Sequence, residues 1–498
     1  MSNKKITIKN TIASIALQFV TILSGFIIPR LLLGTFGSEV NGLVSSLNQF
    51  LNYITLIEGG VVGVISASLY KPLSEKNKNK IDGIVTATNN FFKKIAIVFI
   101  AYTIVLSIAY PLIVKTSFSF SYISTLTLIL SINLFMQYFF SLTWKTLLRA
   151  DKKVCYISLV QILCIVLNTI AVAVLIKVWP NIHIVKLVSA LIYMLQPLLY
   201  SLYVNKYYDI NKKEKPDKES ISQRWNGFGI NIAGFIHNNT DLVVLTVFLD
   251  LKSVSIYTVY SLVTSGLKRI IQSISEGIIP TLGHAYVEND NDRLNKVFDI
   301  YEIVILFATF FLFTAGGLLI TPFVQIYTRG INDADYYQYV LGWLLIVSEM
   351  IFCIKEPHVN MAYCANKFKE ISKYAYVEAG LNIIISVILV IKFGLIGVAI
   401  GTVIAMAYRT IIHIWYLKNN ILNRSIWKTV KRIIVFGCAF IICIIISNKM
   451  FVFSEVSIIS WIYFAIKNTI LVGIIYMAVL LLFYRNKIND ICSMIRRK

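Results

Sequence analysis

The sequence predicts an all-α membrane protein: a polytopic bundle of about fourteen transmembrane helices, arranged as two pseudo-symmetric six-helix lobes plus two C-terminal helices. Three observations predict this fold class: a composition too apolar for a soluble protein, a series of long apolar runs, and a likeness between the two halves of the chain. Of the 498 residues, 57% are hydrophobic and 14% are charged, and the mean hydropathy is +0.72. Soluble domains carry about a quarter charged residues, so a soluble globular fold is excluded.

The apolar runs have the length of membrane-spanning helices. A bilayer core of about 30 Å requires roughly 20 apolar residues in a helix. The runs do not alternate between polar and apolar residues, as the strands of a membrane β-barrel would. The predicted spans are 11–33, 39–69, 91–114, 121–144, 154–178, 183–205, 229–249, 253–280, 299–322, 335–361, 374–392, 395–416, 431–448 and 459–484.

The basic residues predict the orientation of the chain in the membrane. If residue 1 is cytoplasmic, 34 Lys and Arg residues fall in inner segments and seven in outer segments. Membrane proteins concentrate these residues on the cytoplasmic side, so both termini are expected there. Cytoplasmic loops held against an anionic leaflet then explain the net charge of +22 better than a nucleic-acid partner does. The first run lacks an A-x-A-like cleavage site, so we expect a retained helix rather than a signal peptide.

The chain contains an internal repeat, which predicts its division into parts. The loop and helix RADKKVCYISLVQILCIVLNTI at 149–170 resemble CANKFKEISKYAYVEAGLNII at 364–384, at an offset of about 214. Each lobe has an even number of spans, so the two lobes are parallel repeats of the kind that alternating-access transporters use. The predicted parts are an N-terminal six-helix lobe (1–205), a cytoplasmic linker (206–228), a C-terminal six-helix lobe (229–416), and two additional helices with a basic tail (417–498).

The sequence offers little for catalysis or metal binding. The longest loop is the linker at 206–228, which is too short to be a folded catalytic domain. We therefore expect that the protein is not an enzyme. The seven cysteines form no C-x-x-C pair and no metal-ligand spacing with the five histidines. No metal, cofactor or disulfide framework is therefore expected.

Basic residues inside the apolar runs mark a candidate anion site. A charge at mid-bilayer costs about 2.5–3.5 kcal/mol on insertion scales, so it usually faces a cavity or a partner. Arg30 follows Pro29 in the first span, and Lys268 and Arg269 lie in the eighth. An arginine fork and a lysine point charge together suit a phosphate-bearing cargo. For Arg30, snorkelling to the outer interface is the alternative.

Uncharged polar residues crowd the early helices of each lobe. They suit the hydroxyl groups of a sugar, and hydrogen bonding between helices explains them equally well. His237 is interpreted as a packing or hydrogen-bonded histidine rather than a proton carrier. The candidates for lining a polar cavity are Gln18, Asn48, Asn52, Asn231, Asn238 and Asn239.

Several other charges in the spans have structural explanations. Glu302, Arg409 and Lys467 lie near predicted span ends, where snorkelling would satisfy them. Glu58 lies beside two glycines that suit close helix packing, and binding of a coupling ion is its alternative role.

Three further charges lie close together in the tenth span. Lys355 and Glu356 adjoin Pro357, and Glu349 lies nearly two turns earlier. For these three residues the sequence allows two interpretations: an ion pair within this helix, or a functional role.

Two segments of the chain resemble those of polysaccharide flippases. Residues 10–60 contain an apolar helix with an arginine near its end, a short glycine turn and a polar second helix. Residues 147–170 (LLRADKKVCYISLVQILCIVLNTI) carry an A-x-K loop that recurs after 361. In these features the chain is similar to the Wzx-type flippases of the multidrug/oligosaccharidyl-lipid/polysaccharide exporter superfamily.

This resemblance implies a two-lobe transporter in the bacterial plasma membrane. Its cargo would be an undecaprenyl-diphosphate-linked oligosaccharide, flipped to the outer leaflet for surface polysaccharide assembly beside a polymerase and other assembly proteins. By position, Arg30, Lys268 and Arg269 match the family's basic cavity, and the two C-terminal helices match those that form a groove for the lipid tail. Two energy sources are open: a proton or sodium gradient, with Glu58 or Asp241 as the coupling site, and the pull of polymerisation in the outer leaflet.

Two other functions are alternatives to this one. A multidrug/cation antiporter of the same superfamily would prefer an acidic cavity and usually has twelve spans, so the basic candidates and the fourteen spans argue against it. A membrane-embedded polymerase would need a catalytic motif. The D-x-D motif of the chain, Asp333 to Asp335, lies in a short and predicted external loop.

Overall fold

The computed structural model describes residues 3–58, 61–211, 214–217, 219, 228–288, 290–422, 424–453, 455–485 and 487. Over these ranges the secondary structure is helical, joined by turns and short loops, with no strand. Most of the predicted linker at 206–228 lies outside the described residues. The predicted all-α fold class is confirmed.

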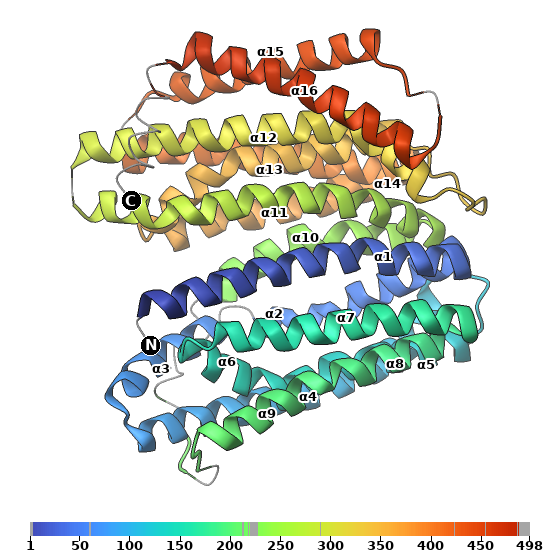
Figure 1. Cartoon of the computed structure of the whole chain (residues 1–498), viewed down its shortest axis with the longest axis vertical. Helices are drawn as coiled ribbons and strands as arrows, with labels where there is room; N and C mark the ends of the chain where they lie inside the picture. Colours follow the sequence, from blue (N-terminus) through green and yellow to red (C-terminus); the bar gives the residue numbers. More distant parts are fainter. Residues whose placement is uncertain are drawn as a thin grey trace. The chain divides into compact units, whose positions relative to one another are not determined.

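The described chain packs as two compact units. The first contains residues 1–235 and 249–255, and the second contains 236–248 and 256–498. The four-part division made from the sequence stays a prediction. Within each unit, long helices lie side by side (Figure 1).

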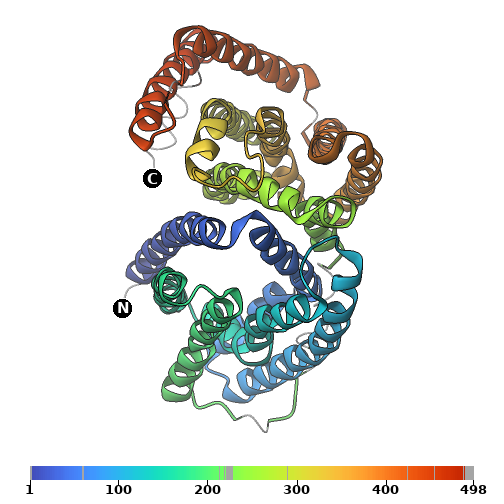
Figure 2. The same ribbon diagram turned by 90° about the vertical axis from the view of Figure 1, so that its right-hand side faces the viewer.

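The helices of the first unit are α1 (Asn3–Leu51), α2 (Thr55–Glu58), α3 (Val61–Glu75), α4 (Lys78–Ile113), α5 (Phe120–Met136), α6 (Leu142–Ala150), α7 (Val154–Val178), α8 (Ile182–Tyr193) and α9 (Leu195–Tyr207). A bend in α1 separates the first two predicted spans. It occurs at Gly37, whose φ of 81° favours glycine, and Figure 2 shows it in the dark blue ribbon. A π-helical turn, Gln137–Ser141, joins α5 to α6.

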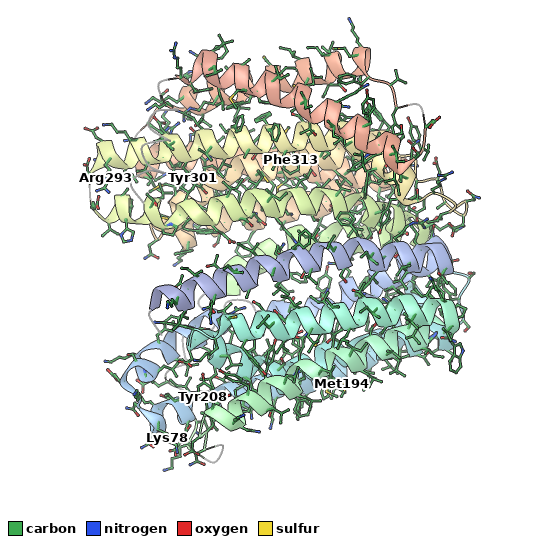
Figure 3. The ribbon with its side chains drawn as sticks, viewed as in Figure 1. Lys78, Met194, Tyr208, Arg293, Tyr301 and Phe313 are labelled. Atoms are coloured by element: carbon green, nitrogen blue, oxygen red, sulfur yellow. The ribbon has the colours of Figure 1, made fainter. Side chains whose placement is uncertain are left out.

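The second unit begins within α10 (Phe228–Phe248). It continues with α11 (Leu251–Val287), α12 (Asn291–Tyr327), α13 (Tyr339–Cys364), α14 (Phe368–Leu417), α15 (Ile426–Met450) and α16 (Ile458–Phe483). Another glycine with positive φ, Gly394 at 55°, divides α14 at the boundary predicted between the eleventh and twelfth spans. Tyr301 of α12 (Figure 3) links neighbouring helices, since its hydroxyl accepts from Asn360 Nδ2 at 2.9 Å and also contacts the Ser275 hydroxyl.

Each of the fourteen predicted spans corresponds to a helix, or to part of a bent or interrupted helix, in the described chain. The fifth span, 154–178, coincides with α7. Nine helical segments of the described chain are long and apolar enough to cross a membrane. The chain is therefore a multi-pass membrane protein.

The internal repeat is visible in the backbone. Lys152 and Asn366 lie in the left-handed region, with φ of 61° and 55°, and they are 214 residues apart. The same turn surrounds both, because Lys153 N donates to Leu148 O at 2.8 Å and Lys367 N donates to Ala362 O at 2.9 Å. At this loop the backbone offset is 214, so the sequence alignment of ADK with ANK is displaced by one residue.

A buried ionic network attaches α15 to α12. It shows that the snorkelling predicted for Glu302 is wrong. Glu302 does not snorkel, because it is 0% exposed and accepts hydrogen bonds from Arg424 Nη2 at 2.7 Å and from Arg432. Both arginines also donate to Asp299 at 3.0 Å. The helix in which Glu302 lies extends well beyond its predicted end, so this carboxylate is enclosed by protein instead of reaching the interface.

The snorkelling predicted for Arg409 is also wrong. It forms a buried ion pair with Glu378, a residue of the same long helix α14 on the other side of the Gly394 bend. The bend brings the two halves of α14 together as an antiparallel pair. A charge that looks terminal in the sequence is thus neutralised inside the unit.

Candidate functional site

The second unit contains a polar cavity of about 370 Å³. This volume lies within the usual range of small-molecule sites. Four helices, α10, α11, α13 and α14, contribute to its wall. The lining residues are Asp241, Leu242, Tyr257, Ser261, Thr264, Ser265, Lys268, Arg269, Gln272, Leu345, Ser348, Glu349 and Thr402.

Helix α11 supplies most of the polar wall through its helical periodicity. Residues three and four apart lie on the same helix face. Ser261, Ser265 and Lys268 follow this spacing, and Thr264 and Gln272 extend the same stripe. Helix α11 therefore presents hydroxyl, amide and ammonium groups to one cavity.

Lys268 is paired across the cavity rather than free. Its Nζ lies 2.9 Å from Glu349 Oε1 on α13, and 4.7 Å from the centre of the Phe352 ring. The other oxygen of that carboxylate, Oε2, is buried and has no hydrogen-bond partner among the described residues. Arg269, the next residue on α11, is exposed and also lines the cavity. The structure thus brings both predicted basic residues of the second unit to one site.

The carboxylate of Asp241 is enclosed by oxygen and amide groups. It accepts from the Tyr257 hydroxyl, and Thr402 Oγ1 lies 3.0 Å from Oδ1 and 2.9 Å from Oδ2. Asn382 Nδ2 donates to the same threonine hydroxyl at 3.2 Å, and its Oδ1 is buried without a partner among the described residues. Oxygen atoms so arranged are the ligands that hard cations prefer.

The charges of the tenth span do not pair with one another. Glu349 pairs with Lys268, and Glu356 accepts from Asn360 Nδ2 at 3.1 Å. Lys355 is 2% exposed, and its Nζ lies 3.8 Å from the centre of the Phe352 ring. The ion pair considered within this helix is therefore wrong for the described structure, because helix packing offers each charge a partner of another kind.

The remaining sequence candidates are placed as follows. Arg30 belongs to the first unit, where it is half-buried and passes close to Gly34 of its own helix, so its part in the cavity stays a prediction. Gln18 and Asn48 are exposed, and Asn52 is half-buried. Asn239 is half-buried on α10, whereas the side chains of Asn231, His237 and Asn238 lie outside the described residues.

Glu58 lies in a different pocket, in the first unit. It accepts from the Tyr138 hydroxyl at 3.1 Å and shares a space of about 80 Å³ with Lys145 and Arg149. Both basic residues lie in the segment 145–153, which the sequence predicts to be an inner, cytoplasmic segment. Their spacing of four residues, which places them on one helix face, was the available signal.

The fold is shared with solved transporters. The lipid II flippase MurJ in an inward closed conformation superposes with a TM-score of 0.76 and 16% identity, over 96% of this chain and 100% of that one. A multidrug resistance MATE transporter of the MOP superfamily, facing inward, superposes with a TM-score of 0.66 and 15% identity, over 80% and 95%. This chain has the fold of these two transporters.

Sequence comparison finds one curated protein that is similar to part of this chain. No family model matches the chain. The probable low-salt glycan biosynthesis flippase Agl15 of Haloferax volcanii is 22% identical over 221 residues, which are 42% of this chain and 45% of that protein. The match thus spans less than half the length of this relative. Because that protein is a probable glycan biosynthesis flippase, the match agrees with the resemblance to polysaccharide flippases found in the sequence.

Three residues that contact the charged groups of the cavity are not marked by any pattern in the sequence. Tyr257 and Thr402 contact Asp241 from α11 and α14, and Phe352 packs under Lys268. Tyrosine, threonine and phenylalanine are common in apolar helices, so nothing in the sequence marks these three. Only the rotation of each helix about its axis turns them toward the site.

Proposed function

We propose that the protein flips an undecaprenyl-diphosphate-linked oligosaccharide from the inner to the outer leaflet of the bacterial plasma membrane. It would work by alternating access and supply a surface polysaccharide pathway (O-antigen, capsule or exopolysaccharide), beside a polymerase. The observation that carries this proposal is the cavity of the second unit, where Lys268 and Arg269 lie beside a stripe of hydroxyl and amide groups. The likeness in fold to MurJ and the match to Agl15 support it.

The cavity has the chemistry that such a headgroup requires. A diphosphate and its sugars cannot enter hydrocarbon, because each unpaired polar or charged group would cost free energy there. The guanidinium of Arg269 can grip phosphate oxygens bidentately, and the ammonium of Lys268 adds a point charge. Ser261, Ser265 and Gln272 offer hydrogen bonds to sugar hydroxyls, while the polyprenyl tail stays in the lipid.

The charges of the cavity also suggest how a cation drives transport. Asp241 and Glu349 balance Lys268 and Arg269, so the empty cavity is formally neutral. A proton or sodium ion that binds the Asp241 carboxylate from the outside and leaves to the cytoplasm would move down its gradient. Its passage would drive the emptied cavity back to the state that faces the cytoplasm, ready for the next headgroup. Asp241 is therefore our candidate for the coupling site, and Arg30 remains a proposed third phosphate contact.

A multidrug/cation antiporter is the second candidate, because MATE transporters share the fold. Such a protein needs a cavity with a surplus of acidic groups for its cationic cargo. The cavity described here holds as many basic as acidic side chains. We therefore favour an anionic cargo.

The test compares a deletion strain with strains that carry substituted forms of the protein. Deletion should cause a complete, unpolymerised lipid-linked repeat unit to accumulate on the inner leaflet. Lys268→Ala combined with Arg269→Ala should reproduce this accumulation while the protein stays in the membrane at normal amount. Lys296→Ala, which removes an exposed lysine of the same unit, is the matched control and should export normally.

Three results would contradict the proposal. Accumulation on the outer leaflet would indicate a polymerase, and increased sensitivity to cationic drugs with normal polysaccharide would indicate an antiporter. Normal export by the Lys268/Arg269 variant would remove the basic cavity from the mechanism.

A further inference from the structure

The first unit contains a second polar pocket, which the proposed function does not use. Its volume is about 80 Å³, and it lies between α2, α3 and α6. Its polar lining consists of Glu58, Lys145, Thr146 and Arg149, and Val62 and Leu142 complete the wall. Two basic side chains and one carboxylate thus face one small space inside a largely apolar bundle.

The two basic residues are held on one face and are not neutralised by ion pairs. Lys145 and Arg149 are four residues apart on α6, so their side chains project in the same direction. Lys145 is half-buried and Arg149 is exposed. Among the described residues, neither has a carboxylate oxygen within 4.0 Å, whereas Glu58 is held by the Tyr138 hydroxyl at 3.1 Å. The pocket therefore carries one net positive charge.

The local fold places this pocket near one end of the unit. The π-helical turn Gln137–Ser141 precedes α6 and carries the tyrosine that reaches Glu58. Helix α6 ends at Ala150, five residues after Lys145, and the turn that follows is held to α1 because Asn10 Nδ2 donates to Lys152 O at 2.9 Å. The sequence predicts this turn to be cytoplasmic, and its basic residues raise the local concentration of anions.

In the second unit the acidic and basic residues are exchanged between the corresponding helices. They also lie at a different distance from the helix end. There the basic pair, Lys268 and Arg269, lies on α11, the second helix of the repeat, and the acid Glu349 lies on the fourth helix, α13. Glu349 precedes the end of its helix by fifteen residues, and Lys145 precedes the end of α6 by five. At 1.5 Å per residue the difference is about 15 Å along the helix. The two pockets are thus separate sites, not two copies of one.

We infer that Lys145 and Arg149 form a phosphate-binding subsite at the cytoplasmic end of the first unit, with Glu58 as an internal carboxylate that competes with the anion. The ligand class is a phosphoryl or diphosphoryl group, whose oxygens an arginine fork and a lysine bind together. The group comes either from a lipid headgroup or from a phosphate free in the cytoplasm. The claim that this subsite is the first contact of the lipid-linked headgroup rests on the proposed function. The claim that the subsite binds a phosphate does not.

The experiment titrates inorganic pyrophosphate into the full chain in phosphatidylcholine nanodiscs and follows the heat of binding. The titrations use a background in which Lys268→Gln and Arg269→Gln remove the basic residues of the other cavity. Saturable binding of pyrophosphate to this double variant then occurs at a site other than the basic residues Lys268 and Arg269. A failure of the flippase proposal does not affect this measurement.

Variants of the pocket identify where the remaining anion binds. Lys145→Gln with Arg149→Gln should weaken pyrophosphate binding at least about tenfold, because both charged contacts are lost. The matched control, Lys76→Gln with Lys80→Gln, removes an exposed lysine of the turn between α3 and α4 and another from the first turn of α4, and should leave the affinity unchanged. Glu58→Gln should tighten binding by about threefold or more, since it removes the competing carboxylate. A residue with only a structural role would not produce a gain in affinity.

A second arm identifies the source of the phosphate. The titration is repeated in nanodiscs that also contain undecaprenyl diphosphate. A lower apparent affinity for pyrophosphate assigns the pocket to the lipid headgroup, and an unchanged affinity assigns it to a soluble phosphate; both outcomes support an anion site. The inference is overturned if the background variant shows no saturable binding, or if the loss of Lys145 and Arg149 leaves the binding unchanged.

Discussion

Asn41 donates a hydrogen bond of 2.8 Å to the hydroxyl of Ser255, a residue 214 positions later. That separation equals the offset of the internal repeat, as measured between the left-handed residues Lys152 and Asn366. Equivalent positions of the two repeats therefore touch, where the start of α11 packs on the second segment of α1. Both side chains are buried, so the hydrogen bond is made away from water.

Gly42, the neighbour of Asn41, allows this close packing, and its replacement should be harmful. A Cβ atom at position 42 would lie 1.7 Å from the backbone oxygen of Leu251. Gly42→Ala should therefore lower stability by about 3 kcal/mol or more, because the backbone itself must move. The measurement is a thermal melt of the purified protein in detergent.

Gly25→Ala is the matched control for this change, since no atom lies within 4 Å of the added Cβ on the same helix. An alanine in an open helical position should stabilise the protein by about 0.5–1 kcal/mol. Equal melting temperatures for the two alanine variants would show that the contact at Gly42 does not constrain the fold.

Glu349→Gln should make the cavity of the second unit a better anion binder and a poorer transporter. The substitution removes the carboxylate that holds Lys268 at 2.9 Å, so this ammonium group becomes available to a phosphate. Pyrophosphate should bind about three to ten times more tightly, and flipping should slow because the headgroup is released less readily. Calorimetry and a proteoliposome flipping assay measure the two effects.

The control for Glu349→Gln is Glu276→Gln, which removes an exposed carboxylate from α11. It should change neither affinity nor flipping rate. If Glu349→Gln leaves the affinity for pyrophosphate at its original value, Lys268 does not bind the anion.

Asp241→Asn should uncouple transport from its ion gradient without unfolding the protein. An asparagine can still accept a hydrogen bond from Thr402, but it carries no charge for a proton or sodium ion to neutralise. Flipping driven by an imposed sodium or proton gradient should fall at least about tenfold, because the coupling ion loses its charged contact. Proteoliposomes with and without each gradient provide the measurement.

Asp292→Asn serves as the control for Asp241→Asn, because Asp292 is exposed in the first turn of α12. A gradient response that survives in Asp241→Asn would exclude this residue as the coupling site. Glu58→Gln, tested in the same vesicles, would then show whether the first unit binds the ion.

Glu302→Gln should loosen α15 from α12. The carboxylate accepts from Arg424, Arg432 and Thr429, and lies 3.3 Å from His358 Nε2. Removing one member of a buried ionic network leaves the others uncompensated, at a cost of about 3–5 kcal/mol. The expected result is a lower melting temperature and a more accessible α15.

Two cysteines of α15 report on this change directly. Cys443 is buried and Cys438 is exposed. In Glu302→Gln, a small maleimide in detergent should label Cys443 faster than in the parent protein, while Cys438 keeps its rate. Unchanged labelling of Cys443 would mean that hydrophobic packing alone holds α15 in place.

The helices could be predicted from the sequence because hydropathy is a property of each segment by itself. The fifth predicted span coincides with α7, and the glycines near 37 and 394 mark the bends that separate neighbouring spans. A segment of about 20 apolar residues has no other stable state in a bilayer, so its own composition decides the outcome.

The partners of the charged residues could not be predicted in this way. Lys268 pairs with Glu349 from 81 residues away, although the sequence suggested partners for Glu349 within its own helix. Glu302 was expected at an interface and instead binds arginines 122 and 130 residues later in the chain. The pair Lys145 and Arg149 was counted as loop and proved to line a pocket.

The amino-acid sequence by itself determined that this chain is a helical, multi-pass membrane protein with an internal repeat, because length, apolarity and periodicity act within single segments. Only the tertiary structure decided which charges are neutralised and which face a cavity. That choice depends on how each helix is rotated against its neighbours, and a rotation of one residue, about 100°, turns a side chain from a cavity to lipid.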